Sequence, residues 1–186
     1  MSEKCQMPVG CRGYSQSMPA TTTVTPAYLR RIESPIGRIE VSSDGTAITA
    51  LAIESHGHLP HDGEPEHTTA VLDDAVLQLG EYFTGQRTVF DLPLALVGTD
   101  FQQSVWSELS QLPYGAVLSY GEIGHATGRA TAGRAVGGAV GANPIPIIVP
   151  CHRVLATNKK ITGYSAGEGI ATKAWLLAHE GIEHRS

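Results

Sequence analysis

The residues best suited to chemistry stand together, where Cys151 is followed directly by His152 and Arg153. A cysteine acts as a nucleophile through its thiolate, which forms more easily beside a base or a cation. Three prolines between residues 143 and 150 make the preceding segment rigid and extended, so the thiol is held in a fixed position. A lone cysteine is often just a small buried apolar residue. Here the adjacent histidine and arginine favour nucleophilic chemistry.

A glycine-rich segment precedes this point. Residues 132–142 contain four glycines, and each destabilises a helix by about 1 kcal/mol relative to alanine. The helix expected over about 131–142 therefore needs compensation, either from close packing or from a bulky partner such as a DNA backbone. Together with a short helix expected from Ser119 to Ala126, it forms a candidate helix-turn-helix. A plain helical hairpin would have the same pattern.

The elements that position these residues follow from hydrophobic spacing. Residues 27–53 alternate in the manner of strands and contain the hairpin signal Asp44-Gly45, which predicts an antiparallel meander. Helical spacing over residues 68–83, with Thr68 or Thr69 as the cap, predicts a helix. A further helix is expected to begin with Asp100 as its cap.

These elements predict an α+β fold. A small N-terminal antiparallel sheet with a helix should precede a mostly helical C-terminal domain that contains the helix-turn-helix. The expected boundaries are a disordered leader over 1–26, a sheet-plus-helix domain over 27–98, and the chemistry-bearing domain over 99–186.

Composition limits the classes of protein that remain. The chain has 186 residues, of which 41% are apolar and 17% charged, and its net charge of −5 argues against a strongly basic nucleic-acid binder. The charge is uneven: residues 1–97 hold 6 Lys/Arg and 12 Asp/Glu, whereas residues 98–186 hold 7 and 6. An anionic partner should therefore meet the second half. No run of 18 apolar residues exists, which excludes a membrane-spanning helix.

Three cysteines, Cys5, Cys11 and Cys151, are too few for a disulfide framework and indicate a reducing compartment. No secretory signal pattern is present, so a cytoplasmic protein is expected. A zinc site at Cys5 and Cys11 would need a fuller set of ligands, and no metal site is predicted.

Pro150-Cys151-His152-Arg153-Val154 resembles the active-site signature of the O6-alkylguanine-DNA alkyltransferases, the methylated-DNA–protein-cysteine methyltransferases. The resemblance covers about residues 99–182. It also rests on Phe101, Val105-Trp106, Leu109, Pro113-Tyr114-Gly115, Ser119-Tyr120, Arg134-Ala135-Val136-Gly137, Asn143-Pro144 and Leu176-Leu177-Ala178-His179-Glu180-Gly181. Over residues 27–96 the likeness is architectural, to a small domain of ribonuclease-H-like type.

The resemblance implies direct DNA repair in a single turnover. Cys151 would attack the alkyl carbon on O6 of guanine, and the alkyl group would stay on sulfur, so that the protein is consumed. His152 would act as the base for Cys151 through a water, and Glu180 would orient His152, as in hydrolase triads. No cofactor is implied.

The resemblance also assigns the substrate pocket. Tyr120 would donate to guanine N3, Ser165 would contact O6, and Asn143 would tie the helix to the active-site segment. The remaining pocket positions are Val140, Val154 and Tyr164.

The implied partner is double-stranded DNA that contains O6-alkylguanine. The protein is expected to bind it as a monomer and not to associate with a membrane. Arg134 resembles the arginine finger that fills the place of a flipped base. The glycine-rich helix would lie in the minor groove, where sequence readout is weak. Its further contacts would be Thr131, Ala135, Gly137 and Gly138.

Two features depart from the family pattern. Residues 167–174 form a link about two residues longer than usual, and Glu168 within it stands near a site that must face DNA phosphates. Either feature could alter access to the pocket or slow DNA binding.

Three other functions fit the sequence less well. A lesion-sensing paralogue would lack the nucleophilic cysteine. A cysteine hydrolase would need an oxyanion hole, for which residues 145–150 offer no glycine-rich donor loop. A regulator that uses the helix-turn-helix alone would need more base-reading side chains than Arg134.

Overall fold

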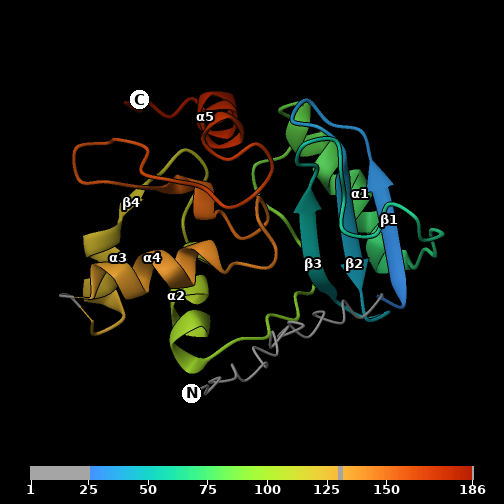
Figure 1. Cartoon of the computed structure of the whole chain (residues 1–186), viewed down its shortest axis with the longest axis horizontal. Helices are drawn as coiled ribbons and strands as arrows, with labels where there is room; N and C mark the ends of the chain where they lie inside the picture. The colour runs from blue at the N-terminus through green and yellow to red at the C-terminus, as the bar shows by residue number, and fades with distance from the viewer. Residues whose placement is uncertain (1–25, 130–131, 186) are drawn as a thin grey trace, which may run out of the picture.

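The computed structural model describes residues 26–129 and 132–185. Its elements in chain order are β1 (Tyr28–Ile32), β2 (Ile39–Ser43), β3 (Ile48–Ile53), α1 (Ala70–Phe83), α2 (Asp100–Ser110), β4 (Leu118–Ser119), α3 (Tyr120–Ala126), α4 (Gly133–Gly141), a 3₁₀ turn η1 (Cys151–Arg153), β5 (Val154–Leu155) and α5 (Ile170–His179). The sheet and α1 lie at one end of the molecule and the other helices at the opposite end (Figure 1). The predicted α+β class is confirmed.

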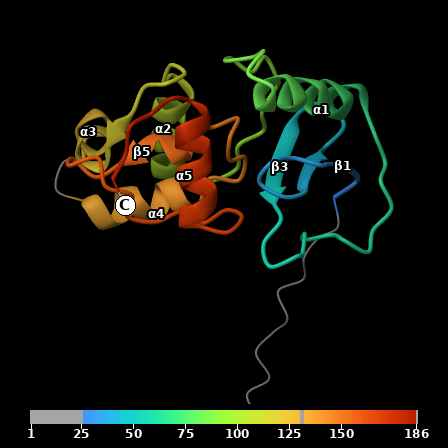
Figure 2. The same ribbon diagram turned by 90° about the horizontal axis from the view of Figure 1, so that it is seen from above.

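The first half is the expected meander. Strands β1, β2 and β3 pair antiparallel in chain order, and α1 lies across one face of the sheet (Figure 2). The Asp44 carboxylate closes the turn between β2 and β3 by accepting from the backbone amides of Thr46 and Ala47 at 2.8 and 2.9 Å. This confirms the hairpin that Asp44-Gly45 predicts.

Helix starts follow the local sequence. Thr69 caps α1, and Ser119 caps α3 in a capping box with Glu122. The prediction that Asp100 caps α2 is wrong, because Thr99 is the cap and Gln102 completes its capping box. Asp100 instead lies in the first turn, where its negative charge meets the positive end of the helix dipole.

Helix α4 is held mainly by its neighbours. It begins at Gly133, later than the expected start, and no side chain caps it. Its apolar face, Val136, Ala139 and Val140, is buried. The indole Nε1 of Trp106 in α2 donates to the backbone carbonyl of Ala139 at 2.9 Å. Close packing therefore compensates on this face for the low helix propensity of glycine.

A short parallel pair, β4 with β5, joins distant parts of the second half by placing Leu118 opposite Val154. Nothing in the sequence analysis predicts this pair. It places the start of α3 beside the strand that follows η1.

One hydrophobic core runs through both halves and includes Tyr82 of α1, Trp106 of α2 and Leu176 of α5. Within the described ranges, no helix combines the length and apolar character needed to cross a membrane.

Candidate active site

The segment before Cys151 is held by a side chain. Asn143 follows α4, and its Nδ2 donates to the carbonyl of Val149 at 2.8 Å while its Oδ1 accepts from the amide of Ile145 at 3.1 Å. These two bonds connect the end of α4 to the proline-rich segment. Cys151 then opens the 3₁₀ turn η1 and is only 4% exposed. The backbone that carries the thiol is thus held by Asn143 before Cys151 and by the 3₁₀ turn after it.

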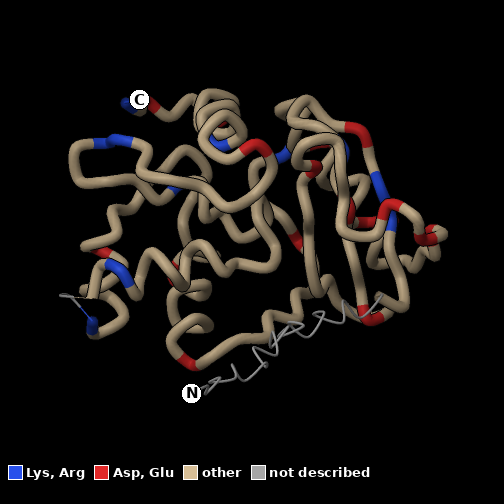
Figure 3. The backbone as a smooth tube through the Cα atoms, viewed as in Figure 1, with Lys and Arg blue, Asp and Glu red and all other residues tan. Residues whose placement is uncertain are grey.

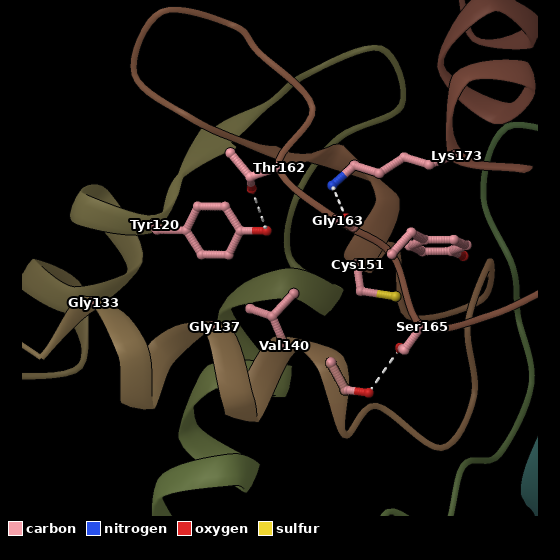
Figure 4. A pocket seen from close by; sticks show the side chains of 11 residues that line it. Tyr120, Gly133, Gly137, Val140, Cys151, Thr162, Gly163, Ser165 and Lys173 are labelled. Atoms are coloured by element: carbon pink, nitrogen blue, oxygen red, sulfur yellow. Dashed lines mark hydrogen bonds between the residues drawn. The ribbon is translucent and has the colours of Figure 1, made fainter. Parts of the chain in front are cut away.

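The thiol borders a cavity of about 420 Å³, which Figure 4 shows between α4 and the segment after β5. Such a volume is in the range of small-molecule sites. The cavity is lined by Tyr120, Gly133, Gly137, Val140, Gly141, Cys151, Thr162, Gly163, Tyr164, Ser165 and Lys173. Residues of α3, α4, η1 and α5 therefore meet around one sulfur atom.

His152, the next residue in η1, is fully buried. Its Nε2 lies 2.8 Å from Oε1 of Glu180. Because an ionised carboxylate can only accept, Nε2 must carry the hydrogen, which leaves the lone pair of the neutral imidazole on Nδ1. Nδ1 is buried and has no hydrogen-bond partner among the described residues. Nδ1 is therefore the nitrogen able to accept a proton.

Glu180 directly follows α5 as its C-cap and is held by several donors. Arg153 donates to it through Nε at 2.6 Å and through a terminal nitrogen at 3.0 Å, and Tyr82 donates its hydroxyl at 2.8 Å. Burial alone would raise the pKa of this carboxyl, but the hydrogen bonds from His152 and Arg153 lower its pKa to about 2. The carboxylate stays ionised and can orient the imidazole.

The pKa of the Cys151 thiol is raised by burial. An opposing influence comes from Lys173 of α5, which is 1% exposed and lines the same cavity. Its Nζ donates to the carbonyls of Val154 at 2.5 Å and Gly163 at 3.3 Å. Burial lowers the pKa of Lys173 to about 8. A charged ammonium at this position favours the thiolate.

Most predicted pocket residues are brought together. Val140, Tyr164 and Ser165 line the cavity with Tyr120, whose hydroxyl accepts from Oγ1 of Thr162 at 3.3 Å. Ser165 donates its hydroxyl to the carbonyl of Gly141 at 2.8 Å.

Two predicted pocket positions do not line the cavity. Val154 is fully buried in β5, and its carbonyl accepts from Nζ of Lys173, which lines the cavity. Asn143 acts on the backbone behind the cysteine.

The exposed face of α4 carries the residues predicted to contact DNA. Arg134, Ala135 and Gly138 are exposed, while Gly137 is half-buried at the cavity. A Cβ built on Gly138 would meet no atom within 4 Å, and one on Gly137 would lie 3.9 Å from the nearest atom, in the Tyr120 ring. Packing within the chain therefore does not require these glycines. Thr131 lies outside the described residues.

The charge distribution seen in the sequence is visible in space. Acidic residues gather on the half that contains the sheet, at the end of the molecule away from α3 and the start of α4 (Figure 3). A negatively charged partner would meet least repulsion at the latter end.

Glu168 does not take the place expected from the sequence. Its carboxylate accepts from the backbone amide of His56 at 2.6 Å, so it is bound to the loop after β3. The longer link is also shaped by Gly167 and Gly169, which both have positive φ. A Cβ on Gly167 would come within 2.6 Å of Oγ1 of Thr172. The link connects the cavity wall to the N-terminal half. The effect of Glu168 on DNA binding stays a prediction.

Cys5 and Cys11 lie outside the described residues. Within the described part of the chain, no cluster of three or more His, Cys, Asp or Glu side chains could hold a metal ion.

Two buried residues of this site escape the sequence analysis. Tyr82 stands in the apolar stripe of α1, three residues after Leu79, where it is easily taken for a core aromatic. Lys173 stands three residues before Leu176 and seven before Glu180 on α5, so a lysine on the buried stripe is the signal that could have found it.

Two family models match the chain. The ribonuclease-like domain of 6-O-methylguanine DNA methyltransferase matches residues 27–96, and the DNA binding domain of 6-O-methylguanine DNA methyltransferase matches residues 100–182.

Individual relatives match over most of their length. The methylated-DNA–protein-cysteine methyltransferase of Mycobacterium tuberculosis is 45% identical over 153 residues, which is 82% of this chain and 92% of the relative. The constitutive enzyme of that name from Bacillus subtilis is 40% identical over 162 residues, covering 85% and 98%. The crystal structure of M. tuberculosis OGT in complex with DNA is similar with a TM-score of 0.73 and 45% identity, covering 82% of this chain and 92% of that one.

Proposed function

The chain belongs to the family of methylated-DNA–protein-cysteine methyltransferases, and we propose that it repairs double-stranded DNA by moving the O6-alkyl group of guanine irreversibly to Cys151. The observation that carries this assignment of the acceptor is the buried pair of Glu180 and His152 directly after Cys151, which lines a cavity beside α4. The alkyl group remains on sulfur, so each molecule acts once.

The reaction needs a thiolate and a stabilised leaving guanine. His152 takes the Cys151 proton at Nδ1 through a water, and Glu180 holds the imidazole in the tautomer that leaves Nδ1 free. The sulfur then attacks the alkyl carbon as the bond from that carbon to O6 breaks. Tyr120 donates toward guanine N3 and Ser165 contacts O6, so that negative charge developing on the base is compensated.

A guanine inside a duplex cannot reach a buried sulfur, so the base must leave the stack. We place α4 in the minor groove, where its exposed small residues allow close approach. Arg134 then fills the vacated place in the duplex. Ala135, Gly137, Gly138 and Thr131 complete this contact with the backbone.

We further propose that the protein acts as a monomer in the cytoplasm, where reducing conditions keep Cys151 reactive. Asn143 contributes by holding the active-site segment, and Val140, Val154 and Tyr164 shape the pocket. The domain boundaries proposed for these roles are 27–98 and 99–186, with 1–26 as a leader.

Intact-protein mass spectrometry tests the proposal. After incubation with a duplex that contains O6-methylguanine, the protein should gain the mass of one methyl group, located on Cys151 by peptide mapping. A gain on another residue, or repeated turnover without any mass gain, would rule out the proposed acceptor.

A further inference from the structure

The N-terminal half reaches the catalytic centre through one buried hydroxyl. Tyr82 of α1 is fully buried, and its hydroxyl donates to Oε1 of Glu180 at 2.8 Å. This is the same oxygen atom that lies 2.8 Å from Nε2 of His152. Both hydrogen bonds are made to Oε1 of Glu180, so a movement of the Tyr82 phenol would shift the carboxylate that holds the His152 imidazole.

The tyrosine hydroxyl is a permanent donor here. Burial, with a further contribution from the negative charge of Glu180, raises the pKa of Tyr82, so the phenol does not ionise at working pH. A hydrogen bond to an ionised group is roughly twice as strong as one between neutral groups. Such a bond both fixes the carboxylate and withdraws charge from the oxygen that holds His152.

The phenol ring is itself held rigidly. It packs against Phe83, Phe90, Tyr114 and His179 with ring centroids 5.3, 5.5, 6.4 and 5.0 Å away. Nε2 of His179 also lies 2.8 Å from the backbone carbonyl of Tyr82. The hydroxyl therefore has little freedom to leave Glu180.

We propose that Tyr82 is a positioning residue for alkyl transfer: through Glu180 it fixes the orientation of His152 and limits the basicity of its imidazole. The proposal rests on the proposed function of Cys151 and His152. It also gives the N-terminal half a part in the reaction, because Tyr82 belongs to α1 and its hydroxyl donates to the Glu180 carboxylate.

Several groups set the charge around this pair. Arg153 of η1 is bonded to Glu180, and Lys173 of α5 acts on His152 across the buried site. The Tyr114 ring packs against Arg153 and Tyr82, but its phenol is neutral and adds no charge. These groups are unchanged when only the Tyr82 hydroxyl is removed, so that removal isolates its effect.

The test compares Tyr82→Phe with the full-length wild type. The single-turnover rate constant for methyl transfer from an O6-methylguanine duplex is measured by quenched mass spectrometry over the pH range in which both proteins stay folded. We expect transfer at neutral pH to be about tenfold slower, the lower end of what a hydrogen bond to a charged group contributes. The acid limb of the pH profile should move to higher pH, because a less compensated carboxylate makes His152 more basic.

Tyr114→Phe is the matched control. Tyr114 belongs to the same aromatic cluster, but its hydroxyl donates to the backbone carbonyl of His179 at 3.2 Å rather than to Glu180. This variant should keep the wild-type rate and pH profile. Thermal unfolding of both variants shows whether they are folded during the assay.

The experiment distinguishes failure of the Tyr82 role from failure of the proposed function. An unchanged rate and profile in Tyr82→Phe, or equal losses in both variants without any movement of the profile, would overturn the positioning role. A wild type that gains no methyl group at all would instead overturn the proposed function, and the role of Tyr82 with it.

Discussion

Replacing Glu180 by glutamine should destabilise the protein strongly at neutral pH and hardly at all in acid. Glutamine has nearly the shape of the protonated acid, so it preserves packing while it removes the charge. Arg153, which is 5% exposed, then loses its carboxylate partner. The amide nitrogen of glutamine is a donor, so it cannot accept the hydrogen bonds that the carboxylate accepted.

The magnitude follows from the pKa of this carboxyl. Its folded value of about 2 lies below the ordinary value of 4.5, and the difference corresponds to about 3 kcal/mol of folding free energy at neutral pH. This agrees with the roughly 3–5 kcal/mol lost when one partner of a buried ion pair is removed. For a chain of this length the expected fall in Tm is about 6–12 °C.

The pH dependence has a definite sign. A carboxyl whose pKa is lowered by folding contributes stability above its unfolded pKa, and this contribution is lost as pH falls toward the folded pKa. The free energies of unfolding of wild type and Glu180→Gln should therefore differ fully above pH 4.5 and converge as pH falls toward about 2. Urea unfolding followed by the fluorescence of Trp106 and Trp175 measures both proteins across this window.

Two results would refute this reasoning. One is a difference smaller than about 1 kcal/mol at neutral pH, the size of an ordinary substitution. The other is a difference that stays constant through the acid window, which would mean that the stability comes from packing and not from the charge of Glu180.

Three further predictions concern the reaction. Cys151→Ala should abolish alkyl transfer in the mass assay while duplex affinity, measured by fluorescence anisotropy, stays close to wild type; residual methyl removal would reject the nucleophile. Arg134→Ala should slow repair of duplex DNA more than reaction with free O6-benzylguanine, since only the duplex requires base extrusion, worth a few kcal/mol; equal losses on both substrates, or a loss that vanishes at high salt, would argue against stack filling. Lys173→Met should raise the pKa of Cys151 and slow transfer, yet increase stability at neutral pH. Burial lowers the pKa of Lys173 from 10.5 to about 8, so the charged ammonium destabilises the fold at neutral pH, and this effect is lost as pH rises from about 8 to 10.5. The transfer rate checks the first effect, and urea unfolding at neutral pH and between about pH 8 and 10.5 checks the second.

Local signals in the sequence predicted the parts of the fold that local interactions decide. The Asp44 turn, the Ser119 cap and the helix over α1 depend on residues within a few positions of one another. The error at Asp100 arose because threonine and aspartate are both good caps, and the capping-box spacing from Thr99 to Gln102 is the signal that decides between them.

The site was predictable where it depended on adjacent residues and hidden where it depended on folding. Cys151 and His152 are neighbours, so their types alone suggested a nucleophile and its base. The contact of Glu168 with His56 joins residues 112 positions apart, and no periodicity marks it. The pair β4–β5 is two residues long on each side, too short for alternation to be recognised.

The hydrogen bonds that complete the catalytic centre also set when it can form. Tyr82 and Glu180 are 98 positions apart, Arg153 and Leu112 are 41 apart, and His152 and Glu180 are 28 apart. Each of these contacts closes a loop of tens of residues, and the entropy lost in closing it is recovered only when the surrounding fold holds both ends. A partly folded chain therefore has the cysteine but not the arrangement that activates it. During refolding, alkyl-transfer activity should therefore return together with the tertiary structure of both halves and not with secondary structure alone.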